Sequence, residues 1–383
     1  MKKKLIALGV LVVVVAVAVI FLATGRGGSD TIKIGVIMST SGPVSHFGTQ
    51  CRDAIQLAVD EINARGGVLG KQVQLIVEDD EKNPEKTMNA LVKLATKDKV
   101  RVVLGALTSD CTLAITQEAQ RRGILLFTPT STNDAVTDAG DLIFRSCFKD
   151  SFQGQVMAQF AIENLNATKA AVLYDMNNDY STGLTKSFEE TFVALGGTVV
   201  ATESYAGGDK DFNAQITKIK AADPDVLFLP DYYNTVSLII NQVRNQGLDA
   251  IMLGPDGWDE LVGQAGEEAV GNYFCNHYSP DADDEDVQEF VRKYRERYGI
   301  TPNALAALGY DAAYIVLEAI ERAGTDDPQV LKEALMETNK KYVTGHITFD
   351  ESHNPVKSTT ILKVVQGPDG RLTTEYVGMV DPE

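Results

Sequence analysis

The feature that most constrains the fold is an alternation of apolar, strand-like segments with helix-like segments along most of the 383-residue chain. The strand-like segments are almost continuously apolar, as in TIKIGVIMS at residues 31–39, and this pattern is typical of parallel strands buried on both faces. The segments between them carry apolar residues at helical spacing, as at residues 49–64. Such an alternation predicts an α/β fold with parallel sheets and right-handed crossover connections.

The alternation runs through the chain twice, and each run has its own strands and helices. The first run predicts strands at 31–39, 73–77, 102–107, 124–127 and 142–147, with helices at 49–64, 83–97 and 111–122. The second predicts helices at 151–165, 184–195, 211–222 and 234–246, with strands at 170–174, 198–205, 226–230 and 251–254. Beyond residues 272–278, the pattern predicts helices at 284–298, 305–323 and 328–338, then short strands at 346–349, 359–365 and 372–377. Two such runs favour two similar lobes over one very wide sheet.

The N-terminus has the composition of a targeting segment. Three lysines at positions 2–4 precede an uncharged apolar run at 5–24, and a polar linker follows at 25–30. A basic segment before an apolar one is typical of export, and a run of about twenty apolar residues is also long enough to span a bilayer. Residues 1–30 are therefore predicted to be a signal peptide or a membrane anchor with its linker, which places the protein in the periplasm or at the cell surface.

The charge balance limits the possible partners. The chain has 35 basic and 53 acidic residues and a formal net charge of −18. No basic cluster occurs beyond the N-terminus, so a phosphate backbone would be repelled. We expect no binding to nucleic acid.

The cysteines exclude two classes of site and leave one question open. Cys51, Cys111, Cys147 and Cys275 form no CxxC pair, which argues against zinc and thioredoxin-type chemistry. In an oxidising compartment they could form up to two disulfides, or they could remain buried free thiols that pack as small apolar residues. The sequence does not fix the pairing.

Hydroxyl side chains gather where two neighbouring strands of the first run end. Thr108 and Ser109 follow the strand at 102–107, and a second group at 128–132 follows the strand at 124–127. Small ligands bind beyond the carboxyl ends of parallel strands, and helix N-termini there suit an anionic group. The two strand ends therefore form a candidate cradle for one carboxylate, although such residues at a helix start are also ordinary N-caps.

No motif of catalysis, phosphate binding or metal binding was found. Residues 66–71, GGVLGK, lack the P-loop spacing and precede a strand, and Ser109 has no G-x-S-x-G context. The four histidines are scattered, and the acidic run at 281–286 lacks the glycine of a calcium loop. We therefore expect no cofactor, no metal and no enzymatic activity.

Several motifs, taken together and in order, resemble the branched-chain amino-acid-binding proteins of ABC importers, which are type I periplasmic binding proteins. They are SGP at 41–43 with FG at 47–48, EINARGGVLG at 61–70, VEDD at 77–80, residues 105–109, TPTST at 128–132, Tyr180 in its loop, DYY at 231–233 and GPDGWD at 254–259. The resemblance covers residues 31–365. It implies two Rossmann-like α/β lobes that are joined by three crossovers and close on a ligand.

The resemblance also implies a domain division, a function and partners. The first lobe would comprise residues 31–148 and 277–352, and the second lobe residues 149–276 and 353–383. The protein would be an extracytoplasmic, monomeric solute-binding protein that delivers an amino acid, aliphatic or otherwise apolar, to ABC permease subunits. Two alternatives stay open: a membrane-anchored sensory module of the same fold, and an enzyme built on this scaffold.

The family's contacts to the polar end of the ligand carry over to five positions. Ser109, with backbone groups near Leu107, would bind the carboxylate. Thr130, through its carbonyl, and Thr132, through its hydroxyl or amide, would contact the polar end of the amino acid. Asp256 would meet the α-ammonium, and its alternative interpretation is a solvated acid in a Pro-Asp-Gly turn. An unpaired buried ammonium is very costly, so Asp256 is the residue on which this hypothesis depends most.

The remaining contacts would be aromatic. Phe47 matches a residue that flanks the ligand, and Tyr180 and Tyr232 match aromatic residues of the second lobe. Trp258 adds bulk near Asp256, although all these aromatic residues could also be core residues; with Leu305, they would make an apolar pocket. Well-known members of the family have Tyr at position 47 and Glu at position 256, and these two departures bear on the side chain of the ligand rather than on amino-acid recognition itself.

Overall fold

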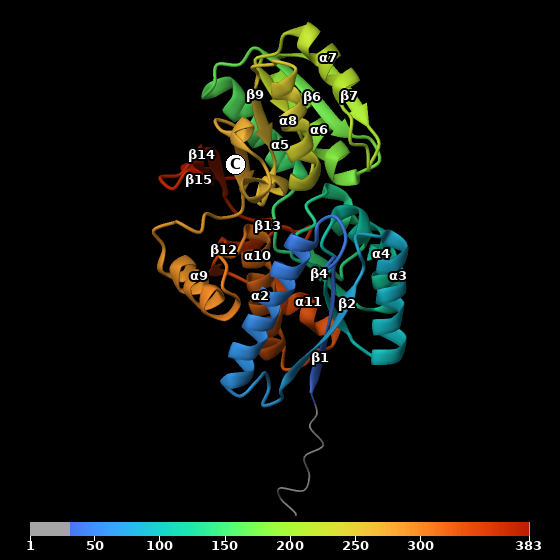
Figure 1. Cartoon of the computed structure of the whole chain (residues 1–383). Coiled ribbons are helices and arrows are strands. Elements are labelled where there is room, and N and C mark those ends of the chain that lie inside the picture. The colour runs from blue at the N-terminus through green and yellow to red at the C-terminus, as the bar shows by residue number, and fades with distance from the viewer. Residues whose placement is uncertain (1–30, 383) are drawn as a thin grey trace, which may run out of the picture.

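The computed structural model of the protein describes residues 31–382 and shows two α/β lobes stacked end to end (Figure 1). Each lobe is built around its own sheet, one of five strands and one of seven, and a third, three-stranded sheet lies beside the first lobe. The predicted targeting segment at 1–30 lies outside the described residues. Within residues 31–382, no helix has the length and apolar composition needed to cross a membrane.

The first lobe is organised around an all-parallel sheet, as the apolar strand pattern predicted. Its strands lie in the order β2-β1-β3-β4-β5. They are β1 (Ile32–Met38), β2 (Val73–Asp79), β3 (Val102–Gly105), β4 (Leu125–Thr128) and β5 (Ile143–Arg145). Helices α3 and α4 pack together over one face and α2, α10 and α11 over the other. These helices are α2 (Ser45–Ala64), α3 (Pro84–Lys93), α4 (Ser109–Arg122), α10 (Ala304–Ala323) and α11 (Pro328–Met336).

The second lobe has a mixed sheet, which corrects the expectation of purely parallel strands. Its order is β15-β14-β10-β9-β8-β6-β7, and β14 runs antiparallel to both of its neighbours, β10 and β15, whereas the other neighbouring strands are parallel. The strands are β6 (Lys169–Asp175), β7 (Thr198–Tyr205), β8 (Val226–Phe228), β9 (Ile251–Gly254), β10 (Tyr273–Asn276), β14 (Thr359–Gln366) and β15 (Leu372–Val380). The helices are α5 (Asp150–Glu163), α6 (Asp179–Ala194), α7 (Asn213–Ala222) and α8 (Tyr233–Asn245). The antiparallel pair follows from the short turn at 367–370, since neighbouring strands joined by so few residues must reverse direction.

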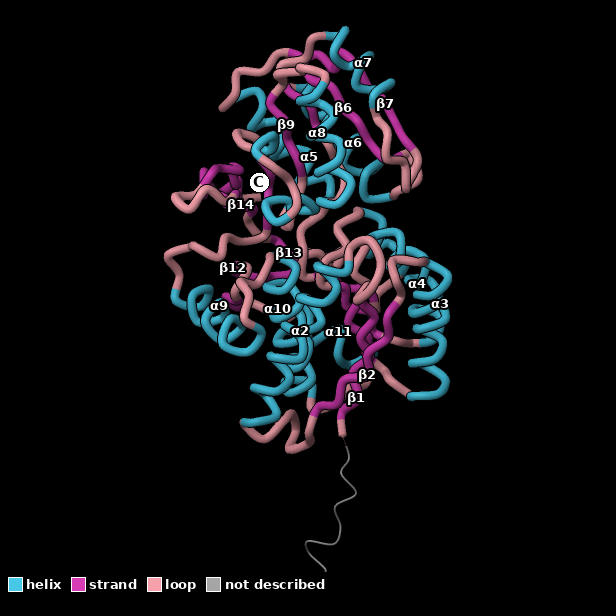
Figure 2. Tube along the Cα trace, in the orientation of Figure 1, coloured by secondary structure: helices cyan, strands magenta, loops and turns pink. Residues whose placement is uncertain are grey.

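The chain passes between the lobes three times, as the resemblance implied. The passages lie between β5 and α5, between β10 and α9 (Glu285–Tyr298), and between β13 and β14. The small sheet, in the order β11-β12-β13, comes before the third passage. Its strands are β11 (Lys340–Tyr342), β12 (Gly345–Phe349) and β13 (Pro355–Val356). Figure 2 shows loops and helix ends facing one another where the lobes meet.

Two helices that carry predicted site residues begin earlier than the sequence indicated. Helix α2 begins at Ser45 rather than near residue 49, so Phe47 lies in its first turn. Gly48 suggested a loop, but its role is close packing: a Cβ there would lie 2.0 Å from the Ser39 carbonyl oxygen. Helix α6 begins at Asp179 rather than at 184, because the Asn178 side chain accepts a hydrogen bond from the Tyr180 N–H and caps the helix.

The four cysteines are free and buried. The disulfide alternative is therefore not realised, and the thiols pack as small apolar side chains. Burial raises the pKa of each thiol, that of Cys111 to about 12, so none is set up as a reactive thiolate.

Candidate functional site

The candidate site is a small cavity between the carboxyl ends of the strands of the two lobes. Every lining residue but one follows a strand end, in agreement with the general position of ligands in parallel sheets. The lining residues are Phe47, Leu107, Thr108 and Thr130 of the first lobe, Leu305 at the start of α10, and Tyr180, Tyr232, Asp256 and Gly257 of the second lobe. Six of the nine predicted site residues are thus brought together.

The first-lobe wall is the turn from β3 into α4. Gly105 makes the turn possible: its φ is +136°, and a Cβ there would lie 2.3 Å from the Ile37 carbonyl oxygen. Thr108 is the N-cap residue of α4, yet its side chain makes no capping bond, and its buried Oγ1 has no hydrogen-bond partner within the described chain. A buried hydroxyl and uncapped helix N–H groups together suit an anionic ligand group.

Hydroxyl groups of the turn after β4 hydrogen-bond to the turn after β3 and to α4, and so hold this wall together. The Thr130 hydroxyl donates to the Leu107 carbonyl at 2.5 Å and the Thr128 hydroxyl to the Ala106 carbonyl at 2.8 Å. The Ser131 hydroxyl lies 2.6 Å from that of Thr112 on α4. Since buried polar groups that are fully paired resist rearrangement, the two strand ends form a rigid unit.

The second-lobe wall combines an aromatic stack with one acid. The rings of Tyr180 and Tyr232 stack with centroids 4.8 Å apart. Asp256 follows β9 and is only 4% exposed. Its Oδ1 accepts a hydrogen bond from the Tyr180 hydroxyl at 2.5 Å, and its Oδ2 lies 2.9 Å from Nε2 of His277. In the part of the chain that the structure describes, no lysine or arginine pairs with Asp256.

The lobes are in contact around the cavity, so the structure is a closed form. The Asn133 amide donates to the Asp179 carbonyl at 2.8 Å, and the Phe47 ring lies 4.7 Å from that of Tyr233. The Lys82 Nζ lies 4.7 Å from the centroid of the Tyr232 ring, which is a cation–π contact. The cavity that remains has a volume of about 10 Å³, which is room for one water molecule.

Burial sets the protonation states around the acid. It raises the pKa of Tyr180 and of Tyr232 well above the ordinary value, and the negative charge of Asp256 adds to the effect. Burial lowers the pKa of His277 to about 4, against the opposing influence of Asp256. At neutral pH both tyrosines and His277 are therefore uncharged.

Three of the predicted residues do not line the cavity. Ser109 lies next to lining residues, and its Oγ accepts from the Asn133 N–H at 3.2 Å. Thr132 lies at the first passage between the lobes, where its carbonyl accepts from the Asp150 N–H at 2.8 Å. Trp258 is fully buried in the second lobe, and its Nε1 donates to the Leu229 carbonyl at 3.0 Å. Trp258 therefore takes the alternative role of a core aromatic residue, because its only polar atom is already satisfied.

Comparison with known proteins decides the family. Residues 31–370 match the model of a family described as periplasmic binding protein. The chain belongs to this family. A relative from Pseudomonas aeruginosa, the leucine-, isoleucine-, valine-, threonine- and alanine-binding protein, is 31% identical over 342 residues, which are 88% of this chain and 90% of the relative.

Solved structures show the same fold. The leucine binding protein LivK from Thermotoga maritima has a TM-score of 0.85 and 35% identity, covering 92% of this chain and 99% of its own. The branched-chain amino acid transporter substrate binding protein LivJ from Streptococcus pneumoniae, in complex with isoleucine, has a TM-score of 0.84 and 36% identity, covering 91% of this chain and 99% of its own. The fold is therefore that of the type I periplasmic binding proteins, a family of solute-binding proteins rather than enzymes.

Two residues close to Asp256 or to the cavity, Thr108 and His277, are not among the nine predicted ligand contacts. Thr108 belongs to the predicted hydroxyl cradle but not to the nine predicted ligand contacts, although its buried hydroxyl lines the cavity. The scattered spacing of the four histidines does not indicate a role for His277. A signal for it existed: it directly follows β10, which pairs in parallel with β9, and carboxyl ends of paired parallel strands lie at the same edge of a sheet. His277 and Asp256 are neighbours for that reason.

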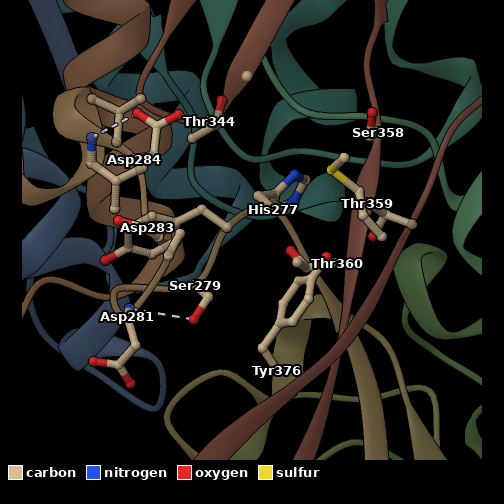
Figure 3. Close-up of a pocket in the computed structure, with 16 residues that line it drawn as sticks. His277, Ser279, Asp281, Asp283, Asp284, Thr344, Ser358, Thr359, Thr360 and Tyr376 are labelled. Atoms are coloured by element: carbon tan, nitrogen blue, oxygen red, sulfur yellow. Dashed lines mark hydrogen bonds between the residues drawn. The ribbon is translucent and has the colours of Figure 1, made fainter.

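A larger cavity, of about 510 Å³, lies beside the second and third passages between the lobes (Figure 3). None of the nine predicted site residues lines it. Figure 3 shows Asp281, Asp283 and Asp284 on one side of it and Thr359 and Thr360 on the other. It lacks a charged group facing uncapped helix N–H groups, so the smaller cavity is the candidate ligand site.

Proposed function

We propose that this periplasmic binding protein captures an amino acid with an apolar side chain and delivers it to an ABC importer. The single observation that carries the proposal is a buried carboxylate, Asp256, that has no lysine or arginine partner among the described residues and faces a turn of free donors across a cavity with no other charged lining residue. A zwitterion needs this arrangement, because its ammonium requires an anion and its carboxylate requires donors. Charge-assisted hydrogen bonds are about twice as strong as neutral ones.

The carboxylate of the ligand would bind at the start of α4. Thr108 contributes a buried hydroxyl without a partner. Ser109 contributes a hydroxyl hydrogen, since its Oγ accepts from the Asn133 N–H and this hydrogen has no acceptor among the described residues. The uncapped N–H groups of the first helical turn add further donors. The ammonium would then lie between Asp256 and the Thr130 carbonyl.

The remaining walls favour an apolar side chain. Phe47, Leu107 and Leu305 face the cavity from the first lobe, and the stacked rings of Tyr180 and Tyr232 face it from the second. The names of the Pseudomonas aeruginosa relative and of the two solved structures, which refer to leucine, isoleucine or branched-chain amino acids, agree with this chemistry. A branched aliphatic side chain is therefore the preferred ligand in this proposal.

In this proposal, closure of the two lobes around the ligand creates the form that the importer recognises. The cavity of about 10 Å³ in this closed form is too small for an amino acid, so the lobes must separate to admit one and then close around it less tightly than in this structure. The proposed lobes are 31–148 with 277–352 and 149–276 with 353–383. The assignment of strands to the five- and seven-stranded sheets supports this division, except that β13 pairs with β12 beside the first lobe, which moves the last boundary to between β13 and β14. Ligand shifts the equilibrium toward closure because only the closed form brings both walls to it. We propose that permease subunits bind the closed monomer.

A thermal-shift screen of the exported chain, without residues 1–30, against the twenty amino acids tests this function, since a bound ligand stabilises by mass action. We expect leucine, isoleucine or valine to raise the melting temperature most. 4-Methylpentanoate and 3-methylbutylamine, which each lack one charged group of leucine, should have little effect. Stabilisation by 4-methylpentanoate equal to that by leucine would contradict the role of Asp256.

An uptake measurement separates transport from sensing. Cells that lack this protein should take up the identified amino acid more slowly from dilute medium. Uptake that is unchanged, with loss of a response to the amino acid, would instead support the sensory alternative. Turnover of an amino-acid amide by the purified protein would support the enzyme alternative.

A further inference from the structure

The Tyr180–Asp256–His277 cluster has hydrogen positions that the heavy atoms determine. The Gly257 N–H donates to the Tyr180 hydroxyl oxygen at 2.9 Å, and a backbone N–H can only donate. The hydroxyl hydrogen of Tyr180 must therefore point to Oδ1 of Asp256, 2.5 Å away. Tyr180 is thus a neutral donor to the acid.

His277 approaches the other oxygen of the acid in a similar way. Its Nε2 lies 2.9 Å from Oδ2 of Asp256, and its side chain is fully buried. Its ring stacks on Phe148 with centroids 3.7 Å apart, which fixes the ring plane. Nδ1 is buried and has no hydrogen-bond partner within the described chain. A ring that carries its one hydrogen on Nε2 satisfies this geometry, because a hydrogen on Nδ1 would be buried without an acceptor.

We propose that His277 is a positioning residue for Asp256: as a neutral imidazole it donates from Nε2, which aims the carboxylate at the cleft and leaves its negative charge for the ligand's ammonium. A lysine or arginine at this place would aim the carboxylate equally well but would neutralise it. The inference rests on the proposed function, in which Asp256 meets an ammonium group.

The acceptor capacity of the carboxylate agrees with this role. An ionised carboxylate has about four lone-pair sites, and Tyr180 and His277 occupy two of them. Two sites remain, one on each oxygen, for the donors of an ammonium group. The nearby Lys357 is buried, but it forms no ion pair with Asp256 among the described residues, and its Nζ donates to the Thr344 hydroxyl at 2.5 Å.

This role also explains how a short acid can serve at position 256. Aspartate has one methylene fewer than glutamate, so its carboxylate lies closer to its own backbone and has fewer rotamers. The Asp256 N–H is held by Oε1 of Gln153 at 3.0 Å, which fixes the backbone. With the backbone fixed, the direction of the carboxylate depends on its two side-chain donors.

The first test uses the ligand-free protein and therefore does not depend on ligand identity. Nitrogen-15 NMR of the four imidazoles, with the His277 signals assigned from their absence in His277→Gln, reports the tautomer. We expect the Nε2–H neutral form throughout pH 5.5–7. An Nδ1–H tautomer or an imidazolium in this range would overturn the proposal, whether or not an amino acid binds.

The second test measures affinity by calorimetry with the amino acid found in the screen. His277→Leu, which removes the donor, should weaken binding about tenfold, whereas His277→Gln, which keeps a side-chain N–H, should bind within about threefold of the wild type. His346→Leu is the control, since that exposed ring bonds to Asn339 away from the cavity. Binding by His277→Leu within twofold of wild type would overturn the proposal.

Loss of binding in a variant counts only if its melting temperature stays near that of the wild type. If His277→Leu does not fold, the comparison of His277→Gln with wild type and the tautomer measurement still decide the question. If the wild type binds no amino acid, the proposed function fails, while the tautomer result still reports on the His277–Asp256 pair separately.

Discussion

The two walls of the cleft are built in opposite ways. The first-lobe wall, formed by the turns after β3 and β4, is neutral. The hydroxyls after β4 bond to backbone carbonyls of the same lobe, and the Thr108 and Ser109 hydroxyls with the uncapped N–H groups of α4 remain as donors. The second-lobe wall carries the charge, and Asp256 is held there by side chains from two other segments, Tyr180 and His277. One wall thus offers several equivalent donors, whereas the other depends on a single acid.

This difference predicts how each wall tolerates change. Removing one of several neutral donors leaves the others in place, so the loss should be modest. Removing the only acid leaves a buried ammonium unpaired, which is far more costly. The closure contacts, which touch no ligand, should matter least.

The largest expected effect is that of Asp256→Ala. We expect affinity for the amino acid to fall more than 100-fold, on the order of 3 kcal/mol or more, because the ammonium loses its counter-charge. Calorimetry measures the affinity, with melting temperature as the check of folding. Asp249→Ala, which removes an exposed acid of the same lobe, should bind as wild type. Binding by Asp256→Ala within about threefold of wild type, under ~1 kcal/mol, would refute the mechanism.

The next largest effect is the dependence of folding stability on pH through His277. Burial lowers its pKa in the folded protein to about 4, below the unfolded value of about 6.5. The unfolded chain therefore binds more protons between these values, and folding stability falls as pH drops from 6.5 toward 4. Asp256 and Lys357 are the charged groups that act on the ring.

Urea unfolding at pH 7 and pH 4.5 measures this contribution. Between pH 7 and pH 4.5, the free energy of unfolding should fall by about 2 kcal/mol more in the wild type than in His277→Gln, because glutamine does not titrate. Equal losses in the two proteins would show that His277 has a similar pKa in the folded and unfolded states, which contradicts its buried neutral form.

A smaller effect is expected from the neutral wall. Ser109→Ala removes one hydroxyl donor to the ligand carboxylate, and we expect affinity to fall about tenfold, roughly 1.5 kcal/mol. Thr116→Val, which removes a hydroxyl on the same helix that is bonded to the Leu113 carbonyl instead of the ligand, is the matched control. A loss as large as that of Asp256→Ala would show that the two walls do not differ in the way described.

The smallest effect is expected at the closure contact between Lys82 and Tyr232. Lys82→Ala removes a cation–π interaction that exists only when the lobes are closed, so dissociation should become about two- to fivefold faster, which corresponds to about 0.5–1 kcal/mol. Stopped-flow fluorescence measures the rate. Lys86→Ala, which removes an exposed lysine paired with Glu81, should leave the rate unchanged. Unchanged dissociation in Lys82→Ala would show that this contact does not hold the closed form.

The strand ends explain why so much of the site could be predicted. Strand positions follow from apolar runs, and the turn after each parallel strand lies at the ligand edge of its sheet. Leu107, Thr130, Tyr232 and Asp256 were placed at the cavity on this basis and through the family resemblance. The second sheet was predicted less well, since the apolar pattern of β14 does not show that this strand runs antiparallel to β10.

Other features depend on contacts between distant segments, which a local pattern does not contain. Trp258 looks the same in sequence whether its ring faces the cavity or the core, and the Leu229 carbonyl that binds its Nε1 is far away in the chain. His277 acquires its role only because β10 lies next to β9. The early start of α6, by contrast, followed from Asn178, a local N-cap that was readable in the sequence.

A crystal structure with the amino acid found in the screen tests the central claim most directly. The account predicts the ligand ammonium within about 3 Å of an Asp256 carboxylate oxygen, with the ligand carboxylate at the start of α4, against Thr108 and Ser109. A ligand bound in the reverse direction, or a closed complex in which Asp256 lies more than about 5 Å from the ammonium, beyond any hydrogen bond, would contradict it.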